Sequence, residues 1–264
     1  LTQSSILLAK GPMVDYNRIR VTLNILQTTS PSSLLIASLD VARKYIYFNG
    51  KKDLDQVLQL AYYAYDKIDS IPGIEAISYD DFMEAGNYDF DETKLLIKIS
   101  DLGKPGYFLY NYLKDKFNIQ IELAETYVLL MVLSIATTKE DIDRLYDALL
   151  AISNEFYDGT TKLPYKKFNY AYPESYARPR SAFHAPKRFV HLEDAVGEIC
   201  AESIMIYPPG IPLVIPGEVI TENIVDMLDF YKENGFNILT DQEDDMVKII
   251  NKEEWIKWSE DDEI

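Results

Sequence analysis

The spacing of apolar residues divides the chain into segments of different secondary structure. From about residue 14 to residue 68 these residues recur every three or four positions, which is the period of an amphipathic helix. We predict a strand over residues 1–9, followed by three helices over residues 14–27, 35–48 and 53–68. Asn49-Gly50 is typical of a helix end and separates the second helix from the third, which Pro72-Gly73 stops.

From about residue 89 apolar and polar residues alternate, which is the period of a half-buried strand. The predicted order is strand, helix, strand, strand, helix. The strands cover residues 94–99, 119–123 and 127–135, the first helix is opened by Gly103-Lys104-Pro105-Gly106 and runs to about Phe117, and the second follows Thr138 and reaches Phe156. The apolar run 127–135 is typical of a central strand. Thr138, followed three residues later by Asp141, indicates a capping box at the start of the last helix. This order predicts a small two-layer α+β unit.

After about residue 159 prolines interrupt the periodic pattern. We predict an extended connector over 159–188, a short helix near 193–203, and a helix that begins after Thr221 and ends near Asn234. Between the two helices, Tyr207–Glu218 holds four prolines and two glycines, which rule out a regular helix. Because this run is apolar, we expect a buried, rigid loop that either links two elements or positions a functional group.

The composition is that of a globular protein, with 47% hydrophobic and 26% charged residues. The formal net charge of −17 argues against a nucleic-acid partner and is compatible with a cationic substrate. No apolar run reaches the roughly 18 residues of a membrane-spanning helix, so we expect no membrane partner. The single Cys200 cannot form an internal disulfide, which favours a reducing, cytoplasmic location. The acidic segments 241–245 and 259–263 are expected to be exposed.

The proline-rich run belongs to a longer pattern. With Ala195-Val196-Gly197 and Ala201-Glu202 before it and Ile220-Thr221 after it, Tyr207–Glu218 resembles the C-terminal signature of the Orn/Lys/Arg decarboxylases. A second match to this family is Thr28-Thr29-Ser30-Pro31-Ser32 near the N-terminus. These enzymes use pyridoxal 5'-phosphate (PLP) and have the aspartate-aminotransferase fold, so the resemblance implies an α/β and α+β architecture.

The resemblance also implies three domains. Residues 1–88 would be the C-terminal part of the PLP-binding large domain, 89–160 a small α+β domain, and 161–264 a C-terminal decarboxylase domain with an acidic tail. In this family the loop that matches Thr28 reaches across a dimer interface, so the expected partner is a second copy in a homodimer or a larger homo-oligomer.

A PLP enzyme binds its cofactor as a Schiff base on a lysine. In the resembled family that lysine follows a histidine, shortly before a stretch like Leu1–Ser5, and no His-Lys pair occurs in this sequence. Lys10 is the nearest lysine, but Lys10-Gly11-Pro12 is typical of a turn. Because the chain also opens without Met, in what reads as a strand, we expect a fragment that does not perform the reaction alone.

The hydroxyl-rich loop has two interpretations. Thr28, Thr29 and Ser30 stand before a predicted helix, where hydroxyls and free N–H groups suit phosphate oxygens. Alternatively, Ser30 or Ser32 simply caps the helix. In the resembled family the matching loop reaches the cofactor phosphate of the partner subunit, which favours a cofactor-binding role for these residues and above all for Thr28.

Glu122 also has two interpretations. In the predicted strand 119–123 the apolar residues take one face, so Glu122 points to the other, which is either solvated or faces a ligand. The resembled decarboxylases carry an acidic residue at the matching place, where it faces the distal cation of the substrate. A carboxylate suits that cation through a charge-assisted hydrogen bond. His184 and His191 have no further Cys or His nearby, so no metal site is expected.

The resemblance implies a PLP-dependent lyase that acts on a basic amino acid. The chain resembles the shorter members of the family, whose usual substrate is arginine and whose product is agmatine, in polyamine biosynthesis. Lysine and ornithine stay open as substrates, as does a fragment that only folds or assembles. An aminotransferase-like reaction is disfavoured by the proline-rich run.

Overall fold

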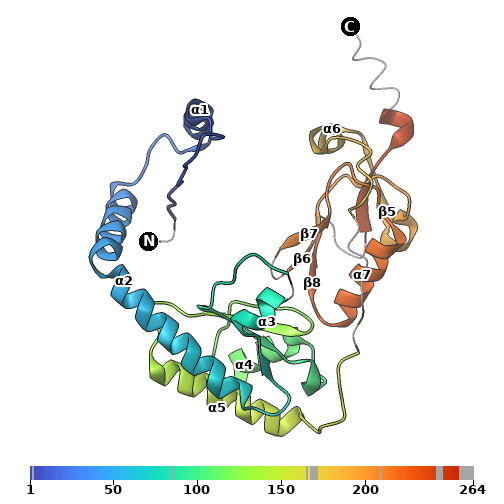
Figure 1. Ribbon diagram of the computed structural model, residues 1–264. Coiled ribbons are helices and arrows are strands. Elements are labelled where there is room, and N and C mark those ends of the chain that lie inside the picture. Colours follow the sequence, from blue (N-terminus) through green and yellow to red (C-terminus); the bar gives the residue numbers. More distant parts are fainter. Residues whose placement is uncertain are drawn as a thin grey trace. The chain divides into compact units, whose positions relative to one another are not determined.

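The structure is a computed structural model, and it describes residues 1, 3–84, 86–164, 166, 172–207, 210–241 and 246–255. The chain divides into two compact units, residues 1–59 and 60–264, each of which is described by itself below (Figure 1). The predicted division into three domains at residues 88 and 160 stays a prediction. The acidic segments 242–245 and 259–263 lie outside the described residues.

The first unit consists of an irregular N-terminal segment and two helices, α1 (Tyr16–Leu26) and the first part of α2 (Ser33–Asp69). Asp15 caps α1 by accepting hydrogen bonds from the backbone N–H groups of Asn17 and Arg18, at 3.0 and 3.1 Å. The first predicted helix is therefore confirmed. The strand predicted over 1–9 is wrong for the described residues, because a strand needs a hydrogen-bonded neighbour and this segment has none among them.

The two helices predicted on either side of Asn49-Gly50 are one continuous helix, α2. A glycine inside a helix costs only about 1 kcal/mol relative to alanine, which the surrounding helical turns can offset. Gly50 does not adopt the left-handed conformation that ends a helix. The Asn49 side chain donates to the Tyr45 carbonyl at 3.1 Å, and Asp53 accepts from the Tyr45 hydroxyl at 2.7 Å rather than capping a new helix.

The second unit begins with a four-stranded antiparallel sheet in the order β1-β2-β4-β3. Its strands and the helices around them are β1 (Glu75–Ala76), α3 (Tyr79–Glu84), β2 (Lys94–Lys98), the 3₁₀ turn η1 (Ser100–Leu102), α4 (Gly106–Phe117), β3 (Leu123–Ala124), β4 (Val128–Val132) and α5 (Lys139–Phe156). Buried apolar residues of the two central strands and of α4 and α5 form its core, among them Leu95, Leu129, Leu113 and Ile152. The predicted strand–helix–strand–strand–helix order is confirmed.

The strand predicted over 119–123 is wrong over most of its length. Only Leu123–Ala124 pair with β4, and residues 118–122 form an irregular turn. The preceding helix ends at Asn118, which takes a left-handed conformation with φ of 52°. The left-handed turn at Asn118 reverses the chain direction, so most of the residues that were assigned to a strand from their alternation lie in the turn instead.

Helix α5 begins with the predicted capping box, in which the side chains of Thr138 and Asp141 each accept from the other's backbone N–H. One turn later, Asp143 accepts from the Tyr63 hydroxyl at 2.5 Å and from Lys67 and Lys139 at 2.6 and 2.8 Å. These donors hold the pKa of the Asp143 carboxyl well below its usual range. The contacts join α5 to the C-terminal part of α2, and the two helices lie side by side (Figure 1).

The C-terminal part of the second unit contains two small antiparallel sheets, one of order β7-β6-β8 and one that pairs β5 with β9. Its elements are α6 (Pro179–His184), β5 (Lys187–His191), the 3₁₀ turn η2 (Leu192–Ala195), β6 (Ile204–Tyr207), β7 (Ile211–Val214), α7 (Glu222–Glu233), β8 (Asn237–Leu239) and β9 (Met246–Ile250). A buried cluster that includes Ile204, Val214, Leu228 and Ile249 joins both sheets to α7.

Two of the predictions between residues 159 and 234 need correction, and one is confirmed. The connector predicted over 159–188 includes α6 and the start of β5. The helix predicted over 193–203 is only the short turn η2. The helix after Thr221 is confirmed, with the Thr221 side chain accepting from the Ile224 backbone N–H as its N-cap.

The proline-rich run also differs from the expected buried loop. Pro208 and Pro209 lie outside the described residues, but the run contains β7, whose Ile211 is 62% exposed. Pro212 is tolerated in this strand because β7 lies at the edge of its sheet, where one side needs no hydrogen-bonded partner. The run therefore forms a sheet edge as well as a connection.

Candidate functional site

The hydroxyl-rich loop lies between α1 and α2, and its residues Thr28, Thr29 and Ser30 are all exposed. The Thr28 hydroxyl oxygen accepts from the Ser30 backbone N–H at 3.3 Å, which gives the loop a compact turn. Within residues 3–84, as far as they are described, neither Ser30 nor Ser32 offers its side chain to the first turn of α2. The capping interpretation is therefore not supported, and the hydroxyls stay available to a ligand.

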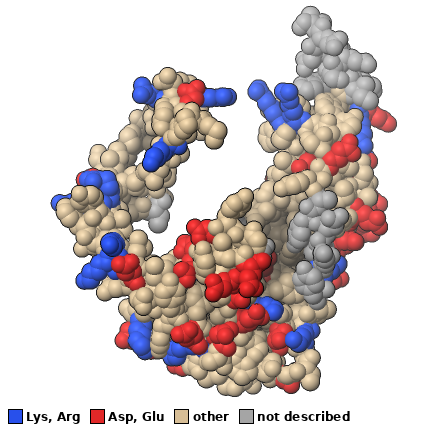
Figure 2. Space-filling view, viewed as in Figure 1, with Lys and Arg blue, Asp and Glu red and all other residues tan. Residues whose placement is uncertain are grey.

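The unit that carries this loop differs in charge from the rest of the chain. Residues 1–59 contain seven Lys and Arg against four Asp and no Glu, whereas the whole chain has a net charge of −17. In Figure 2 most of the acidic side chains lie on the other unit. A positive unit with exposed hydroxyls and loop N–H groups fits an anionic group such as a phosphate.

Glu122 lies in the irregular turn between α4 and β3. Its backbone N–H donates to the Leu130 carbonyl at 3.1 Å, which fixes the turn against β4. The side chain is exposed, and its carboxylate has no hydrogen-bond or ion-pair partner among the described residues. It is therefore free to accept from a cation. Glu122 and the Thr28 loop belong to different compact units, and the structure sets no distance between them.

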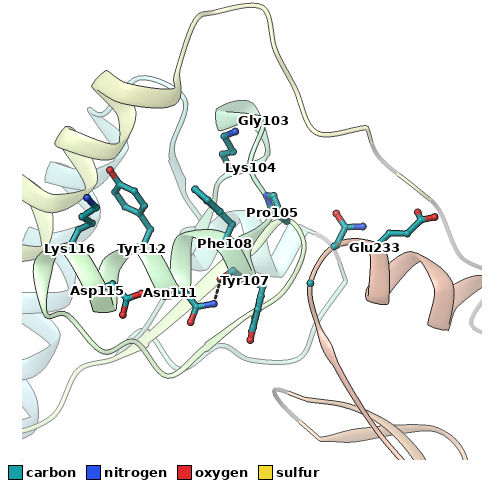
Figure 3. Close-up of a pocket in the computed structure, with 12 residues that line it drawn as sticks. Gly103, Lys104, Pro105, Tyr107, Phe108, Asn111, Tyr112, Asp115, Lys116 and Glu233 are labelled. Atoms are coloured by element: carbon teal, nitrogen blue, oxygen red, sulfur yellow. Dashed lines mark hydrogen bonds between the residues drawn. The ribbon is translucent and has the colours of Figure 1, made fainter. Parts of the chain in front are cut away.

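A pocket of about 690 Å³ in the second unit was not predicted from the sequence (Figure 3). It is lined by residues at the start and along one side of α4 and by the turn after α7, and includes Lys104, Tyr107, Phe108 and Gly235. The Lys104 ammonium lies 5.5 Å from the centre of the Phe108 ring. None of the predicted site residues lines this pocket. The pocket could not be predicted from the sequence, because α4 and the turn after α7 are far apart in the chain and come together only on folding.

The other residues considered from the sequence are not gathered into a site. Lys10, His184 and His191 are exposed. Within the described part of the chain, no group of three His, Cys, Asp or Glu side chains is placed to hold a metal ion. Cys200 is buried, and burial raises the pKa of its thiol to about 11, which makes it a poor nucleophile. No described helix is long and apolar enough to cross a membrane.

Comparison with known proteins gives matches over most of the chain. Residues 1–141 match the family model of the Orn/Lys/Arg decarboxylase major domain, and residues 162–237 match that of the C-terminal domain. The chain is 38% identical over 236 residues to the arginine decarboxylase of Halalkalibacterium halodurans, covering 89% of this chain and 48% of that protein. It is 36% identical over 231 residues to the arginine decarboxylase of Bacillus subtilis, covering 86% of this chain and 47% of that protein.

The fold is also that of a known class. The lysine decarboxylase of Francisella novicida superimposes with a TM-score of 0.72 at 20% identity, over 92% of this chain and 46% of that one. The structure is thus a mixed α/β fold shared with part of that lysine decarboxylase. With more than half of its residues matched by the major-domain model, the chain belongs to the Orn/Lys/Arg decarboxylase family, which is a family of PLP-dependent lyases. It spans about half the length of the curated relatives it matches.

Proposed function

We propose that the chain is part of a PLP-dependent arginine decarboxylase, which converts arginine to agmatine and CO₂. This part would bind the side chain of the substrate and the phosphate of the cofactor. The observation that carries this proposal is the identity of 38% and 36% to two arginine decarboxylases over 89% and 86% of the chain. Residues 1–88, which include the first unit, would be the end of the PLP-binding large domain. Because the sequence has no His-Lys pair, the chain alone does not perform the reaction.

The proposed cofactor contacts come from the first unit. When bound, PLP takes up the electrons released as the α-carboxylate leaves. The hydroxyls of Thr28, Thr29 and Ser30 would hold its phosphate, since they are exposed and are not used to cap α2. The loop N–H groups before α2 add further donors for the same oxygens.

Replacing Thr28 with Ala is expected to weaken PLP binding by about 1 kcal/mol, the typical net contribution of one hydrogen bond. Thr28→Ser keeps the hydroxyl and serves as the matched control, with an affinity close to that of the parent. PLP titration followed by absorbance in the complete decarboxylase measures the difference. Equal affinity of all three proteins counts against the phosphate contact.

The proposed partner is a second copy of the chain, in a homodimer or a larger homo-oligomer in the cytoplasm. Helix α1 has no buried residue, and many large apolar side chains of residues 1–59 are exposed, including Leu8, Met13 and Tyr47. Exposed apolar surface on this scale is typical of an interface. In the complete decarboxylase this surface would be covered by the rest of the large domain, of which residues 1–59 would be one part, as well as by a second subunit.

The experiment that tests the proposed function compares arginine, lysine and ornithine as substrates of the decarboxylase that contains this chain. We expect CO₂ release with the highest kcat/KM for arginine. A higher value for lysine or ornithine moves the assignment to that substrate. No release from any of the three, by protein that has bound PLP, favours the second candidate, a fragment that only folds or assembles.

A further inference from the structure

We propose that Tyr110 and Gln120 are positioning residues that hold Glu122 in place for the distal cation of the substrate. This inference rests on the proposed function, since it concerns how the same site is built. Residues 118–121 do not pair with β4, and the strand pairing holds Glu122 only through its N–H, so side-chain contacts also define where the turn lies.

The side chain of Gln120 is the central contact in this turn. Its amide nitrogen donates both to the Tyr110 hydroxyl and, at 3.0 Å, to the Ile121 carbonyl. The carbonyl of Ile121 belongs to the peptide group whose nitrogen is that of Glu122. Gln120 therefore ties this peptide group to helix α4.

Both ends of the turn are held by hydrogen bonds, and the Gln120 contacts lie between them. At the start, Arg144 donates to the carbonyls of Phe117 and Asn118 at 2.7 and 2.9 Å. At the end, the Glu122 N–H donates to the Leu130 carbonyl, and Ile121 is only 4% exposed. The peptide between Ile121 and Glu122 is thus held on both sides, its N–H by the Leu130 carbonyl and its carbonyl by the Gln120 amide.

Tyr110 is itself held by neighbours. Its ring is parallel to that of Tyr107, with centroids 6.5 Å apart, and Tyr107 packs against Phe236 at 5.6 Å. Helix α4 is fixed to the hairpin of β3 and β4 because the Gly106 N–H donates to the Thr126 carbonyl at 3.0 Å. The Tyr110 hydroxyl is thus a fixed acceptor rather than a mobile one.

The test measures KM and kcat for arginine in the complete decarboxylase with Tyr110→Phe and Gln120→Ala. We expect KM to rise about two- to tenfold, the change in affinity that one hydrogen bond supports, with kcat nearly unchanged. In a Glu122→Gln background the same changes are expected to have no further effect, since the group that they position no longer carries a charge. Tyr112→Phe is the matched control, because the Tyr112 hydroxyl on the same helix donates to Glu155 at 2.5 Å, away from the turn.

The outcomes separate this inference from the proposed function. If Glu122→Gln lowers kcat/KM but Tyr110→Phe and Gln120→Ala leave KM unchanged, the positioning role is overturned and the role of Glu122 stands. Effects that add to that of Glu122→Gln, or that Tyr112→Phe reproduces, also overturn it, because they indicate a general loss of structure. If Glu122→Gln has no effect, the proposed role of Glu122 fails, and the positioning role fails with it.

Discussion

Replacing Glu122 with Gln is expected to lower kcat/KM for arginine about ten- to hundred-fold in the complete decarboxylase. The side chain keeps its shape but loses the charge that accepts from a guanidinium, and a charge-assisted hydrogen bond contributes about 1.5–3 kcal/mol. The carboxylate is exposed and has no partner among the described residues, so the change breaks no internal contact. Steady-state kinetics with arginine, lysine and ornithine measure the effect.

Glu125→Gln is the control for this prediction. Glu125 is also exposed and lies three residues further along the same hairpin, so the change removes the same charge from nearly the same place. A loss caused only by the altered surface potential appears in both variants. Glu122→Gln with parent kinetics on all three substrates contradicts the assignment and leaves Glu122 as a solvated surface residue.

The sequence predicts best the elements whose start is set by residues close together in the chain. The helix after Thr138 and the helix after Thr221 each begin with a side chain that accepts from the first turn, and this signal lies within four residues. The errors have a different origin. Asn49-Gly50 is a local stop signal inside a helix that continues on both sides, and residues 1–9 have strand character without a strand to pair with among the described residues.

The candidate site also has a part that the sequence predicts and a part that it does not. The resemblance to a family implies the roles of Thr28 and Glu122, and the structure adds that both are exposed. The contact between Tyr110 and Gln120 could not be predicted, because it depends on a left-handed turn at Asn118 that brings a strand-like segment back along α4. Alternation of apolar residues carries no information about that reversal.

Replacing Gly106 with Ala is expected to destabilise the second unit by about 3 kcal/mol or more. A Cβ at this position meets the Glu125 carbonyl oxygen at 2.0 Å and the Val128 carbonyl oxygen at 2.9 Å. Both are backbone atoms of the hairpin, so neither can rotate away, and α4 must move instead. Because α4 carries Tyr110, the shift is also expected to raise KM for arginine.

Gly86→Ala is the matched control, measured beside Gly106→Ala by denaturant unfolding. Gly86 has a positive φ of 86°, but no described atom lies within 4 Å of its added Cβ. Its replacement introduces only backbone strain, about 1–2 kcal/mol. A Gly106→Ala variant that is as stable as Gly86→Ala contradicts the close packing of α4 on the hairpin. A larger loss for Gly106→Ala supports it, because of these two glycines Gly106 alone lies against a fixed backbone.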